Sequence, residues 1–149
     1  MRKGLLDRLG LGRPELRAWA MYDWANSAFQ TTIIAAVFPI YFRRVVAADM
    51  PEAEALSRFA WASTIAILVV AVVAPILGAI ADHGGHKKRF LAATTVGCVL
   101  FTALLATVGP GEVVLGMLLL VLSAFMFHTG EDLIAGFLPE IAERGTIGS

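Results

Sequence analysis

Hydrophobic residues along this chain gather into long stretches that polar residues interrupt only briefly. No charged residue occurs from Phe59 to Ala81 or from Phe90 to Gly111. Runs of about 18 or more apolar residues are typical of membrane-spanning helices, since about 20 residues at 1.5 Å each cross a hydrocarbon core about 30 Å thick. The pattern predicts four spans, over residues 19–42, 59–81, 90–108 and 113–138. We therefore expect an all-α integral membrane protein with four transmembrane helices.

Composition supports a membrane protein and gives no support to several other classes. Of the 149 residues, 58% are hydrophobic, against roughly 45–50% apolar residues in an average soluble domain. Cys98 is the only cysteine, so no internal disulfide can form. The sequence has no Walker loop, G-x-S-x-G element or dinucleotide fingerprint, so neither an enzyme nor a bound cofactor is expected. The 12 Lys and Arg residues are too few and too close to the membrane for a nucleic-acid site.

The distribution of positive charge predicts the orientation in the membrane. Five Lys and Arg residues lie in the segment 1–18, three in the connection 82–89 and one in the tail 139–149, whereas the mixed-charge loop 43–58 carries three. The remaining connection, Gly109-Pro110-Gly111, is a tight turn without cations. The positive-inside rule then places both termini in the cytoplasm of a multi-pass protein of the cell (inner) membrane.

Small residues and prolines in the spans predict how the helices pack. Ala71, Ala74 and Gly78 in the second span, like Ala93 and Gly97 in the third, have the spacing that lets helix backbones approach closely in lipid. Alternatively, Ala and Gly are simply common in membrane helices. Pro39 and Pro75 are expected to bend their helices.

The connection between the second and third spans has the sequence GAIADHGGHKKR, from Gly78 to Arg89. Glycines 84 and 85 suit a chain reversal, and Asp82 can accept helix-start N–H groups or pair with the cations that follow. Taken alone, the three consecutive cations would be a cytoplasmic anchor that meets anionic head groups.

The spacing Gly78-x-Ile80-Ala81-Asp82-x-x-Gly85-x-Lys87-Lys88-Arg89 also resembles a motif of the major facilitator superfamily, G-x-L-A-D-[RK]-x-G-R-[RK]-[RK]. That motif likewise lies between the second and third helices on the cytoplasmic side, where it helps to latch the two halves of the transporter. The resemblance implies gate-loop roles rather than substrate contacts for Gly78, Asp82, Gly85, Lys87, Lys88 and Arg89. His83 stands where the family usually has Arg or Lys, which would make one latch charge weaker or pH-dependent.

A narrower resemblance joins three further motifs to the vacuole-effluxer-like branch of that superfamily. These are YDWANSAF at residues 22–29, VFPIYF at 37–42 and GFLPEIA at 136–142, although residues 135–136 depart from the expected Asn-Ala. The branch contains autophagy-linked amino-acid effluxers of fungal vacuoles and many bacterial permeases. The resemblance implies a secondary transporter whose small solute is of the amino-acid class.

The superfamily has two bundles of six helices, so the resemblance implies that this chain is the first part of the N-terminal bundle, ending before helix five. Four helices cannot enclose an alternating-access site, and the chain alone is expected not to transport without the missing C-terminal helices. The alternative is a four-helix membrane protein that assembles with or regulates a partner.

Polar residues at the start of the first span form the first candidate site. At about 100° per residue, Asp23, Asn26 and Gln30 share one face of a helix. An interfacial cap is an alternative for Asp23, while the two amides lie deeper and need a partner or water.

The fourth span carries a second polar group, with His128, Glu131 and Asp132 at positions i, i+3 and i+4. The first and fourth spans line the central cavity in the resembling family and run antiparallel, so Asp23 and Asn26 are expected to face this group. A protonatable cluster could couple proton movement to solute passage, because burial raises carboxylate pKa values and histidine titrates near neutrality. General cavity lining and a surface position remain alternatives. The spacing is not that of a known zinc site, so no metal is expected.

Overall fold

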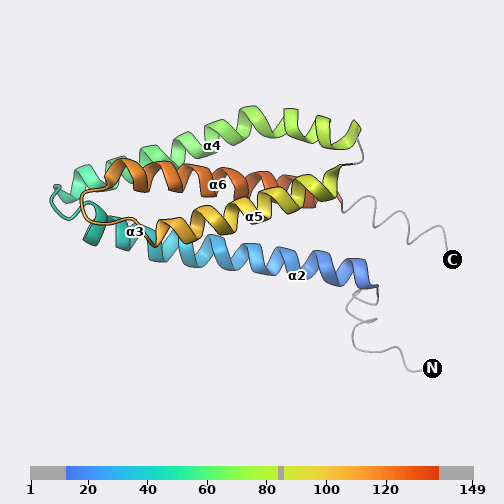
Figure 1. The fold of residues 1–149 in the computed structure, drawn as a ribbon, viewed down its shortest axis with the longest axis horizontal. Coiled ribbons are helices and arrows are strands. Elements are labelled where there is room, and N and C mark those ends of the chain that lie inside the picture. The colour runs from blue at the N-terminus through green and yellow to red at the C-terminus, as the bar shows by residue number, and fades with distance from the viewer. Residues whose placement is uncertain (1–12, 84–85, 138–149) are drawn as a thin grey trace, which may run out of the picture.

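The computed structural model describes residues 13–83 and 86–137, and every element in these ranges is helical (Figure 1). In chain order the elements are α2 (Pro14–Phe29), the π-helix η1 (Gln30–Val37), α3 (Phe38–Tyr41), the π-helix η2 (Phe42–Val46), α4 (Glu52–His83), α5 (Lys87–Leu105) and α6 (Val113–Ala135). The predicted all-α class is confirmed for these residues.

The first four elements form one helical run from Pro14 to Val46, which contains the predicted span 19–42. The run widens into a π-helix directly before Pro39, and the N–H of Phe38 bonds the carbonyl of Ile33 five residues back. Proline lacks an N–H and its ring crowds the carbonyl four residues back, which a π segment can accommodate. Helical residues thus continue through the proline.

The first connection is shorter than the predicted mixed-charge loop 43–58. It covers only residues 47–51, because η2 continues to Val46 and α4 already begins at Glu52. The charged residues pair on the helix surface: Arg43 with Glu52 at 2.6 Å, and Arg58 with Glu54 one turn away at 2.7 Å. A pair one turn apart, such as Glu54 with Arg58, stabilises a helix, and these four residues belong to helix ends, whereas Asp49 does lie in the connection.

The two remaining connections also differ in their limits. α5 begins at Lys87, three residues before the predicted third span, and ends at Leu105 rather than at 108. The turn that follows contains Gly111, whose φ of 81° suits glycine. Glu112 holds this turn, since its carboxylate accepts the N–H of Gly109 at 2.6 Å.

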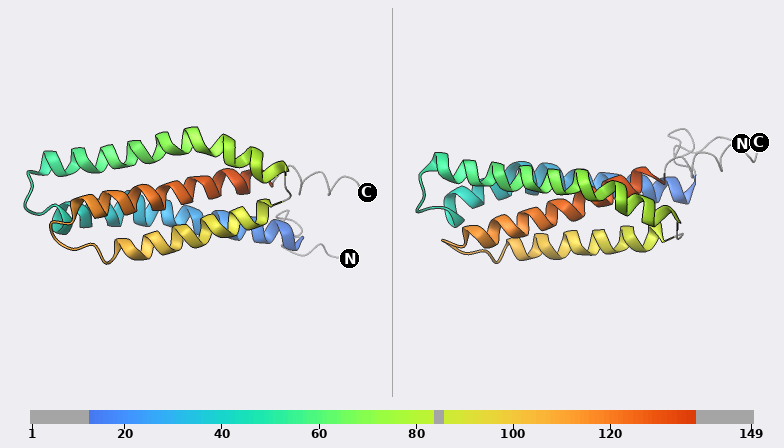
Figure 2. Two further views of the ribbon diagram at one scale, coloured as in Figure 1. Left: turned by 45° about the horizontal axis from the view of Figure 1, so that its top comes forward. Right: turned by 90° about the horizontal axis from the view of Figure 1, so that it is seen from above.

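Within the described residues, three helices are long and apolar enough to cross a membrane: Glu52–Ile80 of α4, Lys87–Leu105 and Val113–Ala135. The helical run Pro14–Val46 is long enough to be a further span. α6 is the central helix. Half of its most apolar stretch is buried inside the structure, compared with 11% of the corresponding stretch in α4 and in α5. It packs against α2, α4 and α5 (Figure 2).

The connections 47–51 and 106–112 lie at one end of the bundle, here called the turn end, at the left of Figure 1. The opposite end, the terminal end, is where α2 begins and α6 ends. Most of the core cluster belongs to the turn end: Phe38, Phe42, Val46, Ala47, Ala55, Leu105, Val108 and Val113. Two hydrogen bonds fasten it, from the Tyr41 hydroxyl to the Val108 carbonyl and from the Gly111 N–H to the Val46 carbonyl.

Small residues do mediate helix contacts, but on α4 they are not the predicted ones. Ala62 and Ala66 are buried, whereas Ala71 is exposed and a Cβ added at Gly78 would meet nothing within 4 Å. On α5, a Cβ at Gly97 would lie 3.0 Å from the Met126 sulfur of α6, so this predicted close approach is present. Pro75 lies inside α4, which is visibly arched in Figure 2.

Candidate functional site

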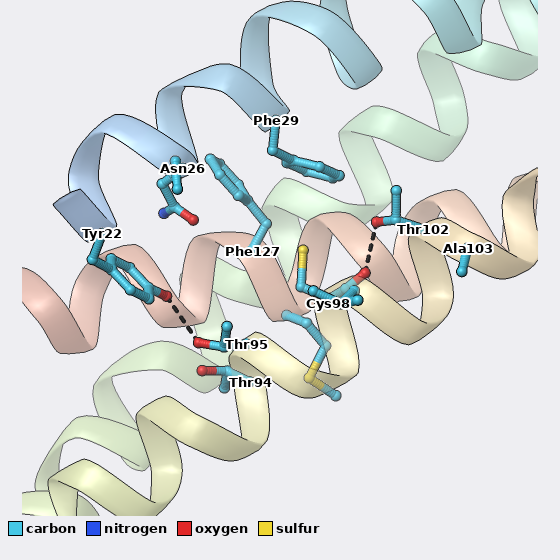
Figure 3. Close-up of a pocket in the computed structure, with 12 residues that line it drawn as sticks. Tyr22, Asn26, Phe29, Thr94, Thr95, Cys98, Thr102, Ala103 and Phe127 are labelled. Atoms are coloured by element: carbon cyan, nitrogen blue, oxygen red, sulfur yellow. Dashed lines mark hydrogen bonds between the residues drawn. The ribbon is translucent and has the colours of Figure 1, made fainter.

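The three polar residues of the first helix do not share one environment. Asp23 and Gln30 are exposed, and Gln30 is the first residue of η1. Asn26 is half-buried and points toward α5 and α6, where it lines a cavity of about 430 Å³ (Figure 3). Of the three candidates, Asn26 is the one that lines this cavity.

The cavity lies between α2, α5 and α6, and its walls are mostly apolar. Phe29 and Phe127 form one wall, with ring centroids 5.0 Å apart. On the opposite side the Tyr22 hydroxyl lies 3.3 Å from the Thr95 hydroxyl and bridges α2 to α5 (Figure 3). Further lining residues are Ala25, Thr94, Cys98, Val99, Thr102, Ala103 and Met126.

The polar residues of α6 line a different pocket, of about 200 Å³, against α4. His128 Nδ1 lies 3.4 Å from Glu131 Oε2, and Asp132 completes the polar side of the pocket. The α4 side is aliphatic, formed by Ile67, Val70 and Ala71. This pocket combines two carboxylates and an imidazole with an apolar wall, so its polar side can accept hydrogen bonds from a cationic group.

Asn26 and the histidine cluster line two different pockets around α6. Phe127 points into the cavity beside α2, whereas the next residue, His128, lines the pocket beside α4. Successive helical residues differ by about 100°, which separates the two directions. Asn26 and the histidine cluster therefore line separate pockets, and the expected meeting of Asp23 with the cluster stays a prediction.

The gate-loop residues divide between two helix ends. Asp82 belongs to the last turn of α4, Gly78 lies one turn earlier, and Gly85 lies outside the described residues. The three cations form the first turn of α5, where Lys88 and Arg89 are exposed. Lys87 Nζ lies 5.8 Å from the centroid of the Phe137 ring, beyond the end of α6. These cations therefore lie at the terminal end of the bundle.

Several residues of the terminal end were not singled out in the sequence. Tyr22 and Trp19 are aromatic residues of the kind that lie at head-group depth. Tyr22 nevertheless points inward to Thr95, and the Trp19 indole N–H donates to the Ile134 carbonyl at 3.3 Å. Gly130 is the point where α6 approaches α2 most tightly among the described glycines. A sequence signal existed only on α5, where hydroxyl residues recur on one face at 94, 95 and 102.

No group of three or more His, Cys, Asp or Glu side chains in the described ranges is arranged to hold a metal ion.

Comparison with known proteins gives two matches. The family described as "Vacuole effluxer Atg22 like" matches residues 45–147. The chain is also 31% identical over 125 residues to "Uncharacterized MFS-type transporter YxiO" of Bacillus subtilis (strain 168), an alignment that covers 83% of this chain. The chain spans 29% of the length of that relative. No solved structure matches the chain significantly.

Proposed function

Because the chain belongs to the Atg22-like vacuole effluxer family of MFS-type transporters, we propose that its helices are part of a secondary transporter for a small solute. The solute class that we propose is amino acids, and the direction is efflux. The relative's description as an MFS-type transporter supports transport in general terms. The long apolar helices support a multi-pass membrane protein.

In this proposal the helical run Pro14–Val46, α4, α5 and α6 are the first four spans of a six-helix N-terminal bundle. The protein lies in the inner membrane with both termini on the cytoplasmic side, so the terminal end is the cytoplasmic end. Gly78, Asp82, Gly85 and the cations at 87–89 then form a gate loop there. Transport by the whole protein requires the further helices that complete the alternating-access site.

The observation that carries the proposed mechanism is the pocket of His128, Glu131 and Asp132. Ionisable side chains in membrane helices are costly and commonly serve transport or proton relay. The 3.4 Å approach of His128 to Glu131 lets protonation of the imidazole form an ion pair and deprotonation break it. The cluster is therefore the proposed proton-coupling group, and Asp23, Asn26 and Gln30 are proposed to face the solute path.

A chimera tests this proposal: residues of this chain replace the matching 125-residue region of the Bacillus relative, and the product is reconstituted in liposomes that contain a pH-sensitive dye. A panel of amino acids is added outside, and solute flux and internal pH are recorded together. We expect the chimera to carry the solutes that the relative carries, with proton movement. A chimera that inserts normally and moves none of those solutes would refute transport.

Coupling is tested separately with Glu131→Gln and Asp132→Asn in the chimera, since both carboxylates line the histidine pocket. Removing a carboxylate of the proposed coupling group is expected to flatten the dependence of flux on pH. If both variants keep the original pH profile, the proposed coupling is wrong while transport itself stands.

A second candidate function is assembly with a partner, without transport by this chain. It is favoured by the extensive exposed apolar surface of α4, which includes Trp61, Leu68 and Val72. Stable insertion of the 149-residue chain together with capture of a specific membrane partner, and an inactive chimera, would favour this alternative.

A further inference from the structure

The cavity between α2, α5 and α6, here called the groove, is open on the side away from α6. α2 and α5 both pack against α6, and between them the Tyr22 hydroxyl meets the Thr95 hydroxyl. Ala25 on α2 and Val99 and Ala103 on α5 line the groove and are exposed. Because α5 is long and apolar enough to cross a membrane, the open side of the groove faces the hydrocarbon of the bilayer.

The lining of the groove suits a hydrocarbon chain. None of its twelve residues is charged at neutral pH. The hydroxyls of Thr94, Thr95 and Thr102 donate to backbone carbonyls of α5 itself, at 3.0, 2.7 and 2.6 Å, and a hydroxyl has only one proton to donate. The Asn26 Nδ2 atom is buried and out of reach of an occupant (Figure 3). The groove therefore offers an occupant chiefly apolar contact.

The groove has the depth of one leaflet. On α5 its lining extends from Thr94 to Ala103, which is roughly 14 Å along the helix axis at 1.5 Å per residue. A bilayer has a hydrocarbon core about 30 Å thick, so each leaflet contributes about half of that. The length of the groove therefore matches the acyl region of a single leaflet.

A lysine lies beyond the terminal end of the groove. Lys88, in the first turn of α5, precedes Thr95 by seven residues and Val99 by eleven, so the three share one face of the helix. Lys88 is exposed, and no described side chain caps the start of α5, where free N–H groups favour an anion. Arg89 follows in the same turn but lies about 100° further round the helix, off the groove face.

The groove has an available positive charge at this end only. Beyond its other end, the segments 30–42 of the first helical run and 104–111 after α5 contain no charged residue. At the terminal end of α2 the Glu15 carboxylate lies 3.8 Å from Arg13 Nε, so its charge is largely balanced. A molecule with an anionic head and an apolar tail is therefore complementary to the groove in one orientation, with its head at Lys88.

We propose that the groove binds an anionic phospholipid from the leaflet at the terminal end of the bundle. One acyl chain lies along Phe29, Val99 and Phe127, and the phosphate accepts hydrogen bonds from the Lys88 ammonium group. The proposal requires that α5 crosses the membrane, and it does not depend on proton coupling or on transport.

Photolabelling of the 149-residue chain in detergent micelles tests the site. Phosphatidylglycerol and phosphatidylcholine, each with a diazirine near the middle of one acyl chain, are added in turn at increasing mole fractions. After illumination, mass spectrometry of peptides locates the label. We expect phosphatidylglycerol to label the segment 94–103 at roughly 5-fold lower mole fraction than phosphatidylcholine, the advantage that one lysine gives an anionic head group.

Two pairs of variants separate the groove from general lipid contact. Lys88→Gln and Arg89→Gln remove the same charge from the same turn, and only Lys88→Gln should abolish the preference for phosphatidylglycerol. Ala103→Phe places a ring on the rim of the groove and should reduce labelling by both lipids. Val96→Phe, at an exposed position of α5 outside the lining, should leave labelling unchanged.

Three results would overturn the proposal. Equal labelling by the two lipids, or an equal effect of Lys88→Gln and Arg89→Gln, would mean ordinary contact with the bilayer. The third comes from the chimera with the Bacillus relative, labelled in the same way whether or not it transports. If the chimera inserts normally and the segment 94–103 is no longer labelled, another helix occupies the groove in place of lipid.

Discussion

Replacing Gly130 with alanine tests the contact that brings α2 onto α6. A Cβ atom at this position would lie 2.8 Å from the Tyr22 hydroxyl oxygen and 3.4 Å from Thr94 Oγ1. A separation below 3.0 Å requires a shift. The Tyr22 ring is rigid and its hydroxyl is bonded to Thr95, so either that hydrogen bond breaks or α2 moves away from α6.

The magnitude follows from three contributions. Overpacking in a helix interface costs about 1–3 kcal/mol, and loss of the hydrogen bond to Thr95 adds about 1 kcal/mol. The higher helix propensity of alanine stabilises the folded state by about 1 kcal/mol. We therefore expect Gly130→Ala to lower the free energy of unfolding by about 1–3 kcal/mol.

The assay is unfolding of the purified chain in mixed micelles by increasing SDS, followed by circular dichroism. Gly78→Ala is the matched control, because a Cβ there meets nothing within 4 Å and should stabilise by about 0.5–1 kcal/mol. Gly97→Ala should fall between them, because its 3.0 Å contact is with the flexible Met126 side chain.

Tyr22→Phe in the Gly130→Ala background removes the atom that clashes. It should recover part of the lost stability, although Tyr22→Phe alone is destabilising. The reasoning is refuted if Gly130→Ala is as stable as Gly78→Ala, or if the double variant is less stable than Gly130→Ala.

Three further substitutions test the turn end by the same SDS titration. Phe42→Ala should cost about 3–5 kcal/mol, since this side chain is fully buried in the core cluster; a loss below 1 kcal/mol would contradict that role. Tyr41→Phe removes the hydrogen bond to the Val108 carbonyl and should cost about 1 kcal/mol, and an unchanged midpoint would show that this bond does not form. Arg43→Gln breaks a pair with Glu52 that is largely exposed; the loss should be below about 1 kcal/mol and should disappear in high salt.

The sequence was sufficient to predict the helices because the signal for a membrane helix is local. Length and apolarity place α4, α5 and α6 without any knowledge of packing. The limits were less predictable, because charged residues were assigned to loops. Arg43 and Glu52 lie on helical turns and satisfy each other across the short connection, a contact that depends on two segments meeting in space.

The candidate sites were less predictable than the helices, because they depend on how each helix is rotated about its axis. Asn26 and His128 were both selected as polar residues in apolar surroundings, but packing turns Asn26 toward α5 and His128 toward α4. No hydrophobic period in the sequence fixes this rotation, since lipid and protein neighbours are equally apolar. Tyr22 shows the same limit, because its inward hydrogen bond to Thr95 gives no sequence signal.

The difference between the two ends of the bundle has a consequence for movement. At the turn end a continuous aromatic and aliphatic core holds the first helical run against α6. At the terminal end α2 meets its neighbours mainly through single contacts: the Trp19 indole on the Ile134 carbonyl, Tyr22 on Thr95, and Phe29 on Phe127. Displacing the start of α2 therefore breaks one or two hydrogen bonds, at about 1 kcal/mol each, whereas displacing its far end disrupts the core.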